Sequence, residues 1–185
     1  YEIHERLVGS EMCIRDRQCG TDLGQVKTKA EPQKDGSYKI SGTKIFISSG
    51  EHDLTENIVH IVLARLPDAP KGTRGISLFI VPKYLPGKIG EDNGVHCGSL
   101  EKKMGIKASA TCVMNFDDAK GWIIGEPNQG LACMFTMMNY ERLSIGLQCL
   151  GRGEASYQSA VEYARERLQG RSATGAKNPE GPADP

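Results

Sequence analysis

The stretch Ser37–Glu51, SYKISGTKIFISSGE, decides the fold of this chain. Apolar residues occupy every second position on both sides of the small polar segment Ser41–Thr43, namely Tyr38, Ile40, Ile45 and Ile47. A period of two is typical of half-buried strands, because successive side chains of a strand point to opposite faces. The pattern therefore predicts two strands joined by a tight turn at residues 41–43.

The end of the second predicted strand has a composition suited to a flat ligand. Phe46 offers an aromatic face, Ser48 and Ser49 offer hydroxyl groups, and Gly50 lets the backbone come close to a ligand. A flat cofactor would pack one ring against Phe46 and accept a hydrogen bond from Ser48. An ordinary hairpin with a polar end has the same spacing, so the spacing alone leaves both hypotheses open.

The composition limits the classes of function. A chain of 185 residues holds one domain, or a small domain and part of another. Its 23 basic and 23 acidic residues cancel, which argues against nucleic acid as a partner, and no apolar run reaches the roughly 18 residues of a membrane span. Six cysteines without a CxxC pair and four histidines without ligand spacing predict no metal site and a reduced, cytoplasmic location.

The rest of the chain divides into a β-rich part and a helical part. Further strands are expected at residues 26–31, 57–65, 75–81 and 112–116, with turns at 33–36 and 117–121. After Gly130 the apolar period changes to three and four through Gln169, which predicts one face of a long amphipathic helix. Such a helix cannot bury its apolar face alone, so partner helices are expected beyond residue 185.

Several segments together resemble one enzyme family. The string KIFISSG, residues 44–50, resembles the flavin-contacting strand of the acyl-CoA dehydrogenases. The resemblance extends almost without a break over residues 18–170, and its other segments are 18–23, 75–83, 102–111 and 122–130. The long loop at residues 83–93 resembles the long-form branch of the family.

The resemblance implies an α+β chain with two domains. Residues 18–125 would form the mainly β middle domain, a β-barrel or orthogonal sandwich, and residues 126–185 the truncated start of an α-helical bundle. Residues 1–17 include LVGSEMCIRDR, which resembles a translated sequencing adapter, so they are expected to be a non-native leader. Arg15, Asp16 and Arg17 stand where the family has threonine, glutamate and proline.

The resemblance also implies FAD as the cofactor. Phe46 would lie against the isoalloxazine ring, while Ile47 and Ser48 would face its polar edge. Gly20 and Thr21 would lie between the flavin and the thioester of the substrate, which makes Thr21 a substrate-binding residue as well. Finally, Arg167 and Gln169 resemble a turn that reaches the flavin pyrophosphate of a neighbouring subunit, with Gly170 where the family has phenylalanine.

The implied reaction is the α,β-dehydrogenation of an acyl-CoA thioester in fatty-acid β-oxidation. A carboxylate takes the proton from Cα while Cβ gives a hydride to flavin N5. Most members carry this base in the helical bundle, which for this chain would be beyond residue 185. Glu141 is the alternative, because it aligns with the catalytic glutamate of isovaleryl-CoA dehydrogenases. Asn139 and Arg142 match substrate-side positions.

The partners implied are acyl-CoA, an electron-transfer flavoprotein and further copies of the chain in a homodimer or homotetramer. Two other functions stay open. An acyl-CoA oxidase of the same fold would return its electrons to oxygen. A non-catalytic β-barrel binding or scaffold fragment would explain the replaced residues 15–17 and the absence of the usual base.

Overall fold

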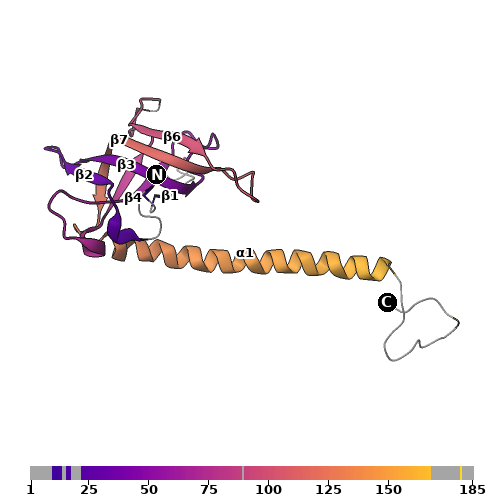
Figure 1. Ribbon diagram of the computed structural model, residues 1–185. Coiled ribbons are helices and arrows are strands. Elements are labelled where there is room, and N and C mark those ends of the chain that lie inside the picture. The colour runs from indigo at the N-terminus through magenta and orange to yellow at the C-terminus, as the bar shows by residue number, and fades with distance from the viewer. Residues whose placement is uncertain (1–9, 14–15, 18–21, 89, 168–179, 181–185) are drawn as a thin grey trace. The chain divides into compact units, whose positions relative to one another are not determined.

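The structure is a computed structural model that describes residues 10–13, 16–17, 22–88, 90–167 and 180 (Figure 1). The chain forms two compact units, Tyr1–Thr136 and Met137–Pro185. The strands are β1 (Ser10–Cys13), β2 (Lys29–Pro32), β3 (Tyr38–Ser48), β4 (Val59–Ala64), β5 (Ser77–Pro82), β6 (Val95–Leu100) and β7 (Thr111–Ile124). Two 3-10 turns, η1 (Leu23–Gln25) and η2 (Gly72–Gly75), and the helix α1 (Gly130–Glu166) complete the described elements.

One seven-stranded sheet makes up the first unit. Its order is β1-β4-β5-β7-β3-β2, and β6 also pairs with β7. All pairs are antiparallel except β1 with β4. The sheet also curls, because Ala30 at the β2 edge donates its N–H to the Arg65 carbonyl at 2.8 Å and Arg65 donates to the Thr28 carbonyl at 2.9 Å. The prediction of a mainly β domain followed by a helix is confirmed.

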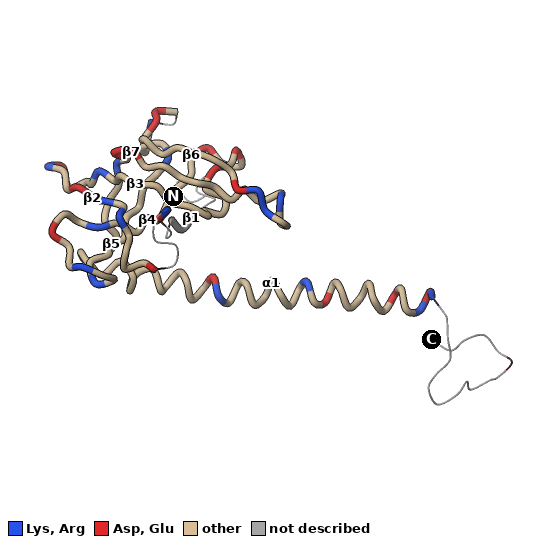
Figure 2. The backbone as a smooth tube through the Cα atoms, in the orientation of Figure 1, with Lys and Arg blue, Asp and Glu red and all other residues tan. Residues whose placement is uncertain are grey.

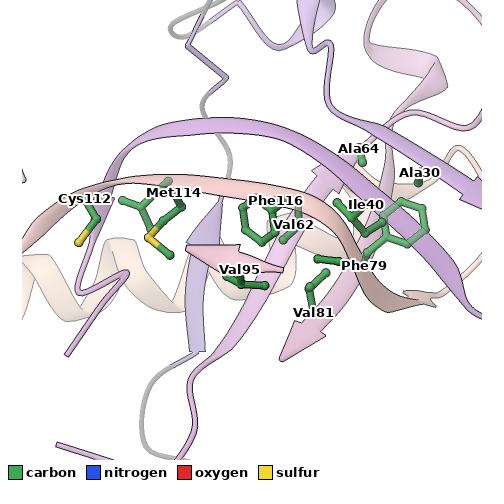
Figure 3. Close-up of a cluster of buried hydrophobic side chains, with 12 residues drawn as sticks. Ala30, Ile40, Val62, Ala64, Phe79, Val81, Val95, Cys112, Met114 and Phe116 are labelled. Carbon is green, nitrogen blue, oxygen red and sulfur yellow. The ribbon is translucent and has the colours of Figure 1, made fainter. Parts of the chain in front are cut away.

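The core lies inside this curled sheet and explains its stability. Side chains from six of the strands meet there, among them the fully buried Ile40, Phe79 and Phe116 (Figure 3). Burying an apolar side chain of this size contributes about 1.5–3 kcal/mol. The core residues of β4 (Val62, Ala64), of β5 (Phe79, Val81) and of the first part of β7 (Cys112, Met114, Phe116) stand two positions apart, as expected for side chains on one face of a strand.

The predicted turn at residues 41–43 is wrong. Residues 38–48 form the single strand β3, with a register shift between Ile40 and Gly42. Thr28 crosses at this point, and a Cβ on Gly42 would lie 2.6 Å from the Thr28 hydroxyl oxygen. The small residues therefore allow a close crossing within a continuous strand, where the sequence pattern suggested a reversal of the chain.

The predicted turn at residues 117–121 is wrong for a similar reason. β7 runs through it, and Asp118 takes a left-handed conformation with φ 54°. The Asp118 carboxylate accepts hydrogen bonds from Lys39 at 3.1 Å and from Ser41 at 2.9 Å on the neighbouring strand. These contacts hold an irregular residue inside the ladder.

The other strand predictions differ in their outcome. The strands at 57–65 and 75–81 and the turn at 33–36 are confirmed by β4, β5 and the β2–β3 connection. The strand expected from residue 26 begins at Lys29, because η1 comes first. β1 and β6 were not expected, since both are short and lack a clear apolar alternation.

The helix α1 starts in the first unit, packed directly on β5. Gly130 donates its N–H to the Ile76 carbonyl at 2.8 Å, and a Cβ on it would lie 2.4 Å from the Ser77 carbonyl carbon. One turn later Met134 is buried. Within the second unit the predicted apolar face is present but exposed, with Leu143, Leu147 and Leu150 each at least 69% exposed. In the part of the chain that the structure describes, no helix is apolar enough over a sufficient length to cross a bilayer.

Candidate functional site

The carboxyl end of β3 presents an aromatic ring to solvent. A register shift between Lys44 and Ile47 interrupts the pairing of β3 with β7. Within this bulge Phe46 takes a left-handed conformation, φ 57°, and its side chain is 49% exposed, whereas Ile47 is 2% exposed. A bulky residue rarely adopts this conformation, which costs of order 1–3 kcal/mol. The bulge therefore turns the ring outward while the next residue, Ile47, belongs to the core.

Ser48 and the loop that joins β6 to β7 continue this surface. Ser48 is exposed and pairs with Thr111, and Ser49 donates its N–H to the Ala110 carbonyl at 2.7 Å. The loop encloses a surface hollow of about 300 Å³. Residues lining it are Leu100, Glu101, Lys102, Lys103, Lys107, Ser109, Ala110 and Thr111.

The hollow is suited to an anion. Figure 2 shows the basic stretch of this loop in blue. Lys103 is held in place by its hydrogen bond to the Ser109 carbonyl at 2.6 Å, while Lys102 and Lys107 are exposed. Ammonium groups and hydroxyls at one place attract phosphate. Sequence reasoning missed this hollow, although three lysines within six residues were a signal for it.

A buried ion pair joins Asp16 to Lys44, the residue of β3 at which the register shift begins. Lys44 and Asp16 are 0% and 1% exposed, and the ammonium nitrogen lies 2.6 Å from Asp16 Oδ1. Burial alone would raise the pKa of the Asp16 carboxyl, but the charge of Lys44 and the hydrogen bonds from Lys44 and Thr28 hold it below its ordinary value. Asp16 therefore stays ionised in the folded state. The sequence showed only a lysine at a position where β3 otherwise buries isoleucine.

The structure describes only some of the remaining predicted site residues. Gly20, Thr21 and Gln169 lie outside the described residues. In the second unit, Arg142 donates to the Asn139 side-chain oxygen at 3.1 Å, so α1 brings these two predicted residues together. Glu141 is exposed on the same helix, and Arg167 directly follows its last turn, donating its N–H to the Tyr163 carbonyl at 2.9 Å.

The described residues offer no further catalytic centre of an obvious kind. Among them no group of three or more histidine, cysteine or carboxylate side chains is placed to hold a metal ion. Burial and the neighbouring Cys97 thiol raise the pKa of the Cys112 thiol to about 11. A thiol that stays protonated is a poor nucleophile. The surface formed by Phe46, Ser48 and the lysine hollow is thus the best-equipped ligand site of the first unit.

Comparison with known families assigns both parts of the chain. Residues 12–119 match the family described as "Acyl-CoA dehydrogenase, middle domain", and residues 128–178 match "Acyl-CoA dehydrogenase, C-terminal domain". The first match alone covers more than half of the chain.

Individual relatives agree with this assignment. The chain is 53% identical to 3-methylmercaptopropionyl-CoA dehydrogenase of Ruegeria pomeroyi, over 89% of this chain and 29% of that protein. It is 44% identical to the broad-specificity linear acyl-CoA dehydrogenase FadE5 of Mycobacterium tuberculosis, over 92% of this chain and 29% of that protein. The chain thus spans less than a third of the length of these relatives.

A solved structure shares the fold. Butyryl-CoA dehydrogenase from Megasphaera elsdenii superimposes with a TM-score of 0.72 at 32% identity, over 86% of this chain and 39% of that chain. The resemblance stated from the sequence, including the long-form branch to which the Ruegeria protein belongs, is confirmed.

Proposed function

Because the chain belongs to the acyl-CoA dehydrogenase family, we propose that it forms the flavin- and substrate-binding part of an acyl-CoA dehydrogenase. The enzyme would remove a proton from Cα and a hydride from Cβ of an acyl-CoA thioester. The conformation of Phe46 is the observation that carries this proposal. A left-handed backbone at a bulky residue is unfavourable for stability, and such strain clusters at ligand sites. Here it places Phe46 beside the exposed Ser48 at the end of a strand.

The residues present fit FAD. The Phe46 ring would pack against the flat flavin, and the Ser48 hydroxyl beside it would bond a ring heteroatom. The lysine hollow supplies the cations that the phosphate groups of a nucleotide cofactor or of coenzyme A require. When bound, FAD would supply the acceptor for the hydride.

The chain's own residues would orient the substrate and exclude water. Asn139 and Arg142, already hydrogen-bonded to each other, would hold the acyl-CoA thioester. The apolar ring of Phe46 would keep water from one side of the reacting carbons. Gly20, Thr21, Arg167 and Gln169 are proposed to have the roles that the family implies. The proposed domains are residues 18–125 and 126–185. The segment 1–17 is expected from its sequence to be a non-native leader, but strand β1 and the buried Asp16 within it take part in the fold, and the family match begins at residue 12.

Replacing Phe46 with glycine tests this function. Glycine adopts φ near 57° without strain, so the free energy of unfolding should be unchanged or rise by up to about 1 kcal/mol. The lost ring should weaken FAD binding at least about tenfold. Unfolding in urea and a titration with FAD, followed by flavin fluorescence and visible absorbance, measure the two effects.

Ile106→Gly is the matched control. Ile106 is also left-handed, at φ 50°, and 66% exposed. It belongs to the β6–β7 loop but is not one of the residues that line the hollow. The Ile106→Gly variant should show the same change in the free energy of unfolding as Phe46→Gly, and it should weaken FAD binding by no more than about twofold. If the unaltered chain stays colourless with FAD, or if Phe46→Gly binds FAD as well as the unaltered chain does, the scaffold alternative replaces the enzyme.

The catalytic base is proposed to lie beyond residue 185, with Glu141 as the second candidate. We expect Glu141→Gln to leave turnover within about twofold in a version extended by the remaining helices of its relatives, because Gln keeps the helix and only removes the charge. Asp substitution at the same position is the control for side-chain length. A loss of about a hundredfold or more would make Glu141 the base.

The partners proposed are acyl-CoA, an electron-transfer flavoprotein and other copies of the chain, in the cytoplasm. An acyl-CoA oxidase is the second candidate, because it would use the same surface. Reoxidation of the reduced enzyme by air alone, without the electron-transfer flavoprotein, would favour the oxidase.

A further inference from the structure

The set of β3 residues that points into the core changes between Lys44 and Ile47. Side chains on one face of a strand stand an even number of positions apart, as the buried Ile40 and Lys44 do. Ile47 is buried as well, although it stands three positions after Lys44. In the same interval three steps along β3 stand opposite two steps along β7. The strand therefore contains one extra residue here, and the left-handed conformation of Phe46 accommodates it.

Lys44 is bound to the inside of the sheet by its charge. Its ammonium nitrogen lies 2.6 Å from Asp16 Oδ1 and donates to the Leu63 carbonyl of β4 at 2.6 Å. Asp16 is fixed in turn, because it accepts hydrogen bonds from the Thr28 N–H at 2.8 Å and from the Thr28 hydroxyl at 2.7 Å. Turning Lys44 to the outer face would break both of its contacts and remove a positive charge from beside a buried carboxylate, which is strongly unfavourable.

An uncharged residue at position 44 would permit another arrangement of the strand. Ile45 and Ile47 stand two positions apart, so both could face the core if the extra residue lay before position 45. Phe46 would then be an ordinary strand residue with negative φ, and its ring would point in a different direction. Lys44 excludes this arrangement, because Lys44 and Ile45 cannot both face the core in a regular strand.

We propose that Lys44, held by Asp16, is a positioning residue that fixes the extra residue of β3 at Phe46. The pair thereby sets the direction in which the aromatic ring faces a ligand. Both side chains are at most 1% exposed, so they act through Phe46 and not by contact with the ligand. The inference rests on the proposed function, because the direction of the ring matters for binding only if Phe46 packs against the flavin.

Glycine and alanine at position 46 report the backbone conformation without any ligand. Both substitutions remove the ring, so the two variants differ mainly in the conformation that each residue prefers. At φ near 57° alanine is strained and glycine is not, whereas in an ordinary strand alanine is the more stable of the two. In the otherwise unaltered chain, urea unfolding should give Phe46→Gly a folding equilibrium constant about fivefold or more above that of Phe46→Ala.

The double variant Lys44→Thr, Asp16→Asn removes both charges of the pair. Threonine is common in strands and is tolerated on either face, so position 44 no longer has to point inward. In this background the order should reverse, with the folding equilibrium constant of Phe46→Ala about twofold or more above that of Phe46→Gly. If glycine keeps its full advantage, the positioning role is overturned.

A single substitution serves if the double variant does not fold. Asp16→Asn keeps Lys44 but leaves no buried carboxylate to hold it. The advantage of glycine over alanine at position 46 should then fall to about twofold or less. An unchanged advantage in Asp16→Asn overturns the positioning role in the same way.

FAD affinity tests the link to the ligand site. With Phe46 in place, Lys44→Thr, Asp16→Asn should bind FAD about tenfold more weakly in a titration followed by flavin fluorescence. The matched control is Lys83→Met, Glu51→Gln, which removes a less buried ion pair, 21% and 30% exposed, outside β3. It should change neither the advantage of glycine at position 46 nor FAD affinity by more than about twofold. Equal effects in both double variants would overturn the specific role of Lys44.

The outcomes separate this inference from the proposed function. A reversed order of glycine and alanine with unchanged FAD affinity overturns the link between the ion pair and the flavin. If the unaltered chain binds no FAD, the proposed function fails and this link fails with it. The comparison of glycine with alanine needs no ligand, so it still decides whether Lys44 fixes the conformation of Phe46.

Discussion

Replacing Lys44 with methionine is expected to lower the free energy of unfolding by about 3–5 kcal/mol. The ammonium group is fully buried and lies 2.6 Å from both Asp16 Oδ1 and the Leu63 carbonyl oxygen. Methionine fills the same space but removes the ammonium charge that lies beside the buried Asp16 carboxylate. Urea unfolding near neutral pH, with circular dichroism as the signal, measures the loss.

A second substitution, Asp16→Asn, tests whether the charge of the buried Asp16 carboxylate causes the loss of stability in Lys44→Met. Asp16→Asn keeps one oxygen for the bond that Oδ2 accepts from Thr28 N at 2.8 Å, and its NH2 group can donate to the Thr28 hydroxyl, which in the unaltered chain donates to Oδ1 at 2.7 Å. The amide is neutral and needs no cation. The double variant Lys44→Met, Asp16→Asn should therefore recover more than about 1 kcal/mol of the loss. A double variant whose loss equals the sum of the two single losses would contradict the account.

The surface pair of Lys39 and Asp118 is the matched control. Lys39 Nζ and Asp118 Oδ2 lie 3.1 Å apart between β3 and β7, but the two side chains are 47% and 65% exposed. Water screens such a pair, so Lys39→Met should change the free energy of unfolding by less than about 1 kcal/mol. If Lys39→Met lowers the free energy of unfolding as much as Lys44→Met does, burial does not determine how much an ion pair contributes to stability.

The chain is expected to lose stability in mild acid because of His60. This side chain is fully buried and packs edge-on against Phe116, with ring centroids 5.7 Å apart. Burial, with smaller effects of the charges of Lys83 and His52, lowers the pKa of His60 from 6.5 to about 4. The unfolded chain therefore binds a proton between these two values that the folded chain does not, and stability falls as the pH falls through this window.

The expected loss is about 2 kcal/mol between roughly pH 7 and pH 5. Urea unfolding at the two pH values measures it. The pKa values of Asp16 and Asp118 are also lowered, but these carboxyl groups reduce stability only at more acidic pH. They therefore do not obscure the loss of stability that His60 causes between pH 7 and pH 5 or so.

His60→Leu should remove most of this acid dependence, because leucine has no proton to bind. His96→Gln, at an exposed histidine paired with Asp92, should retain it. An equal pH dependence in the unaltered chain and His60→Leu would exclude His60 as the cause.

The sequence alone predicted the β domain and the long helix, and it led to the proposal that Phe46 faces a ligand. Alternation at Ile40 and Ile47, and the apolar runs of β4 and β5, are local patterns that survive in the folded chain. The segment 44–50 also predicted Phe46 and Ser48 as neighbours at a strand end. These features follow from the spacing of side chains along one segment, which any fold must respect.

Only the tertiary structure decided that residues 41–43 and 117–121 continue their strands. Small and polar residues mark turns in an isolated segment, but here Thr28 crosses Gly42 and Lys39 bonds Asp118 from another strand. The Lys44–Asp16 pair likewise joins two segments that are distant in the chain. Each depends on where the backbone of a second segment runs, and side-chain spacing within one segment carries no information about that.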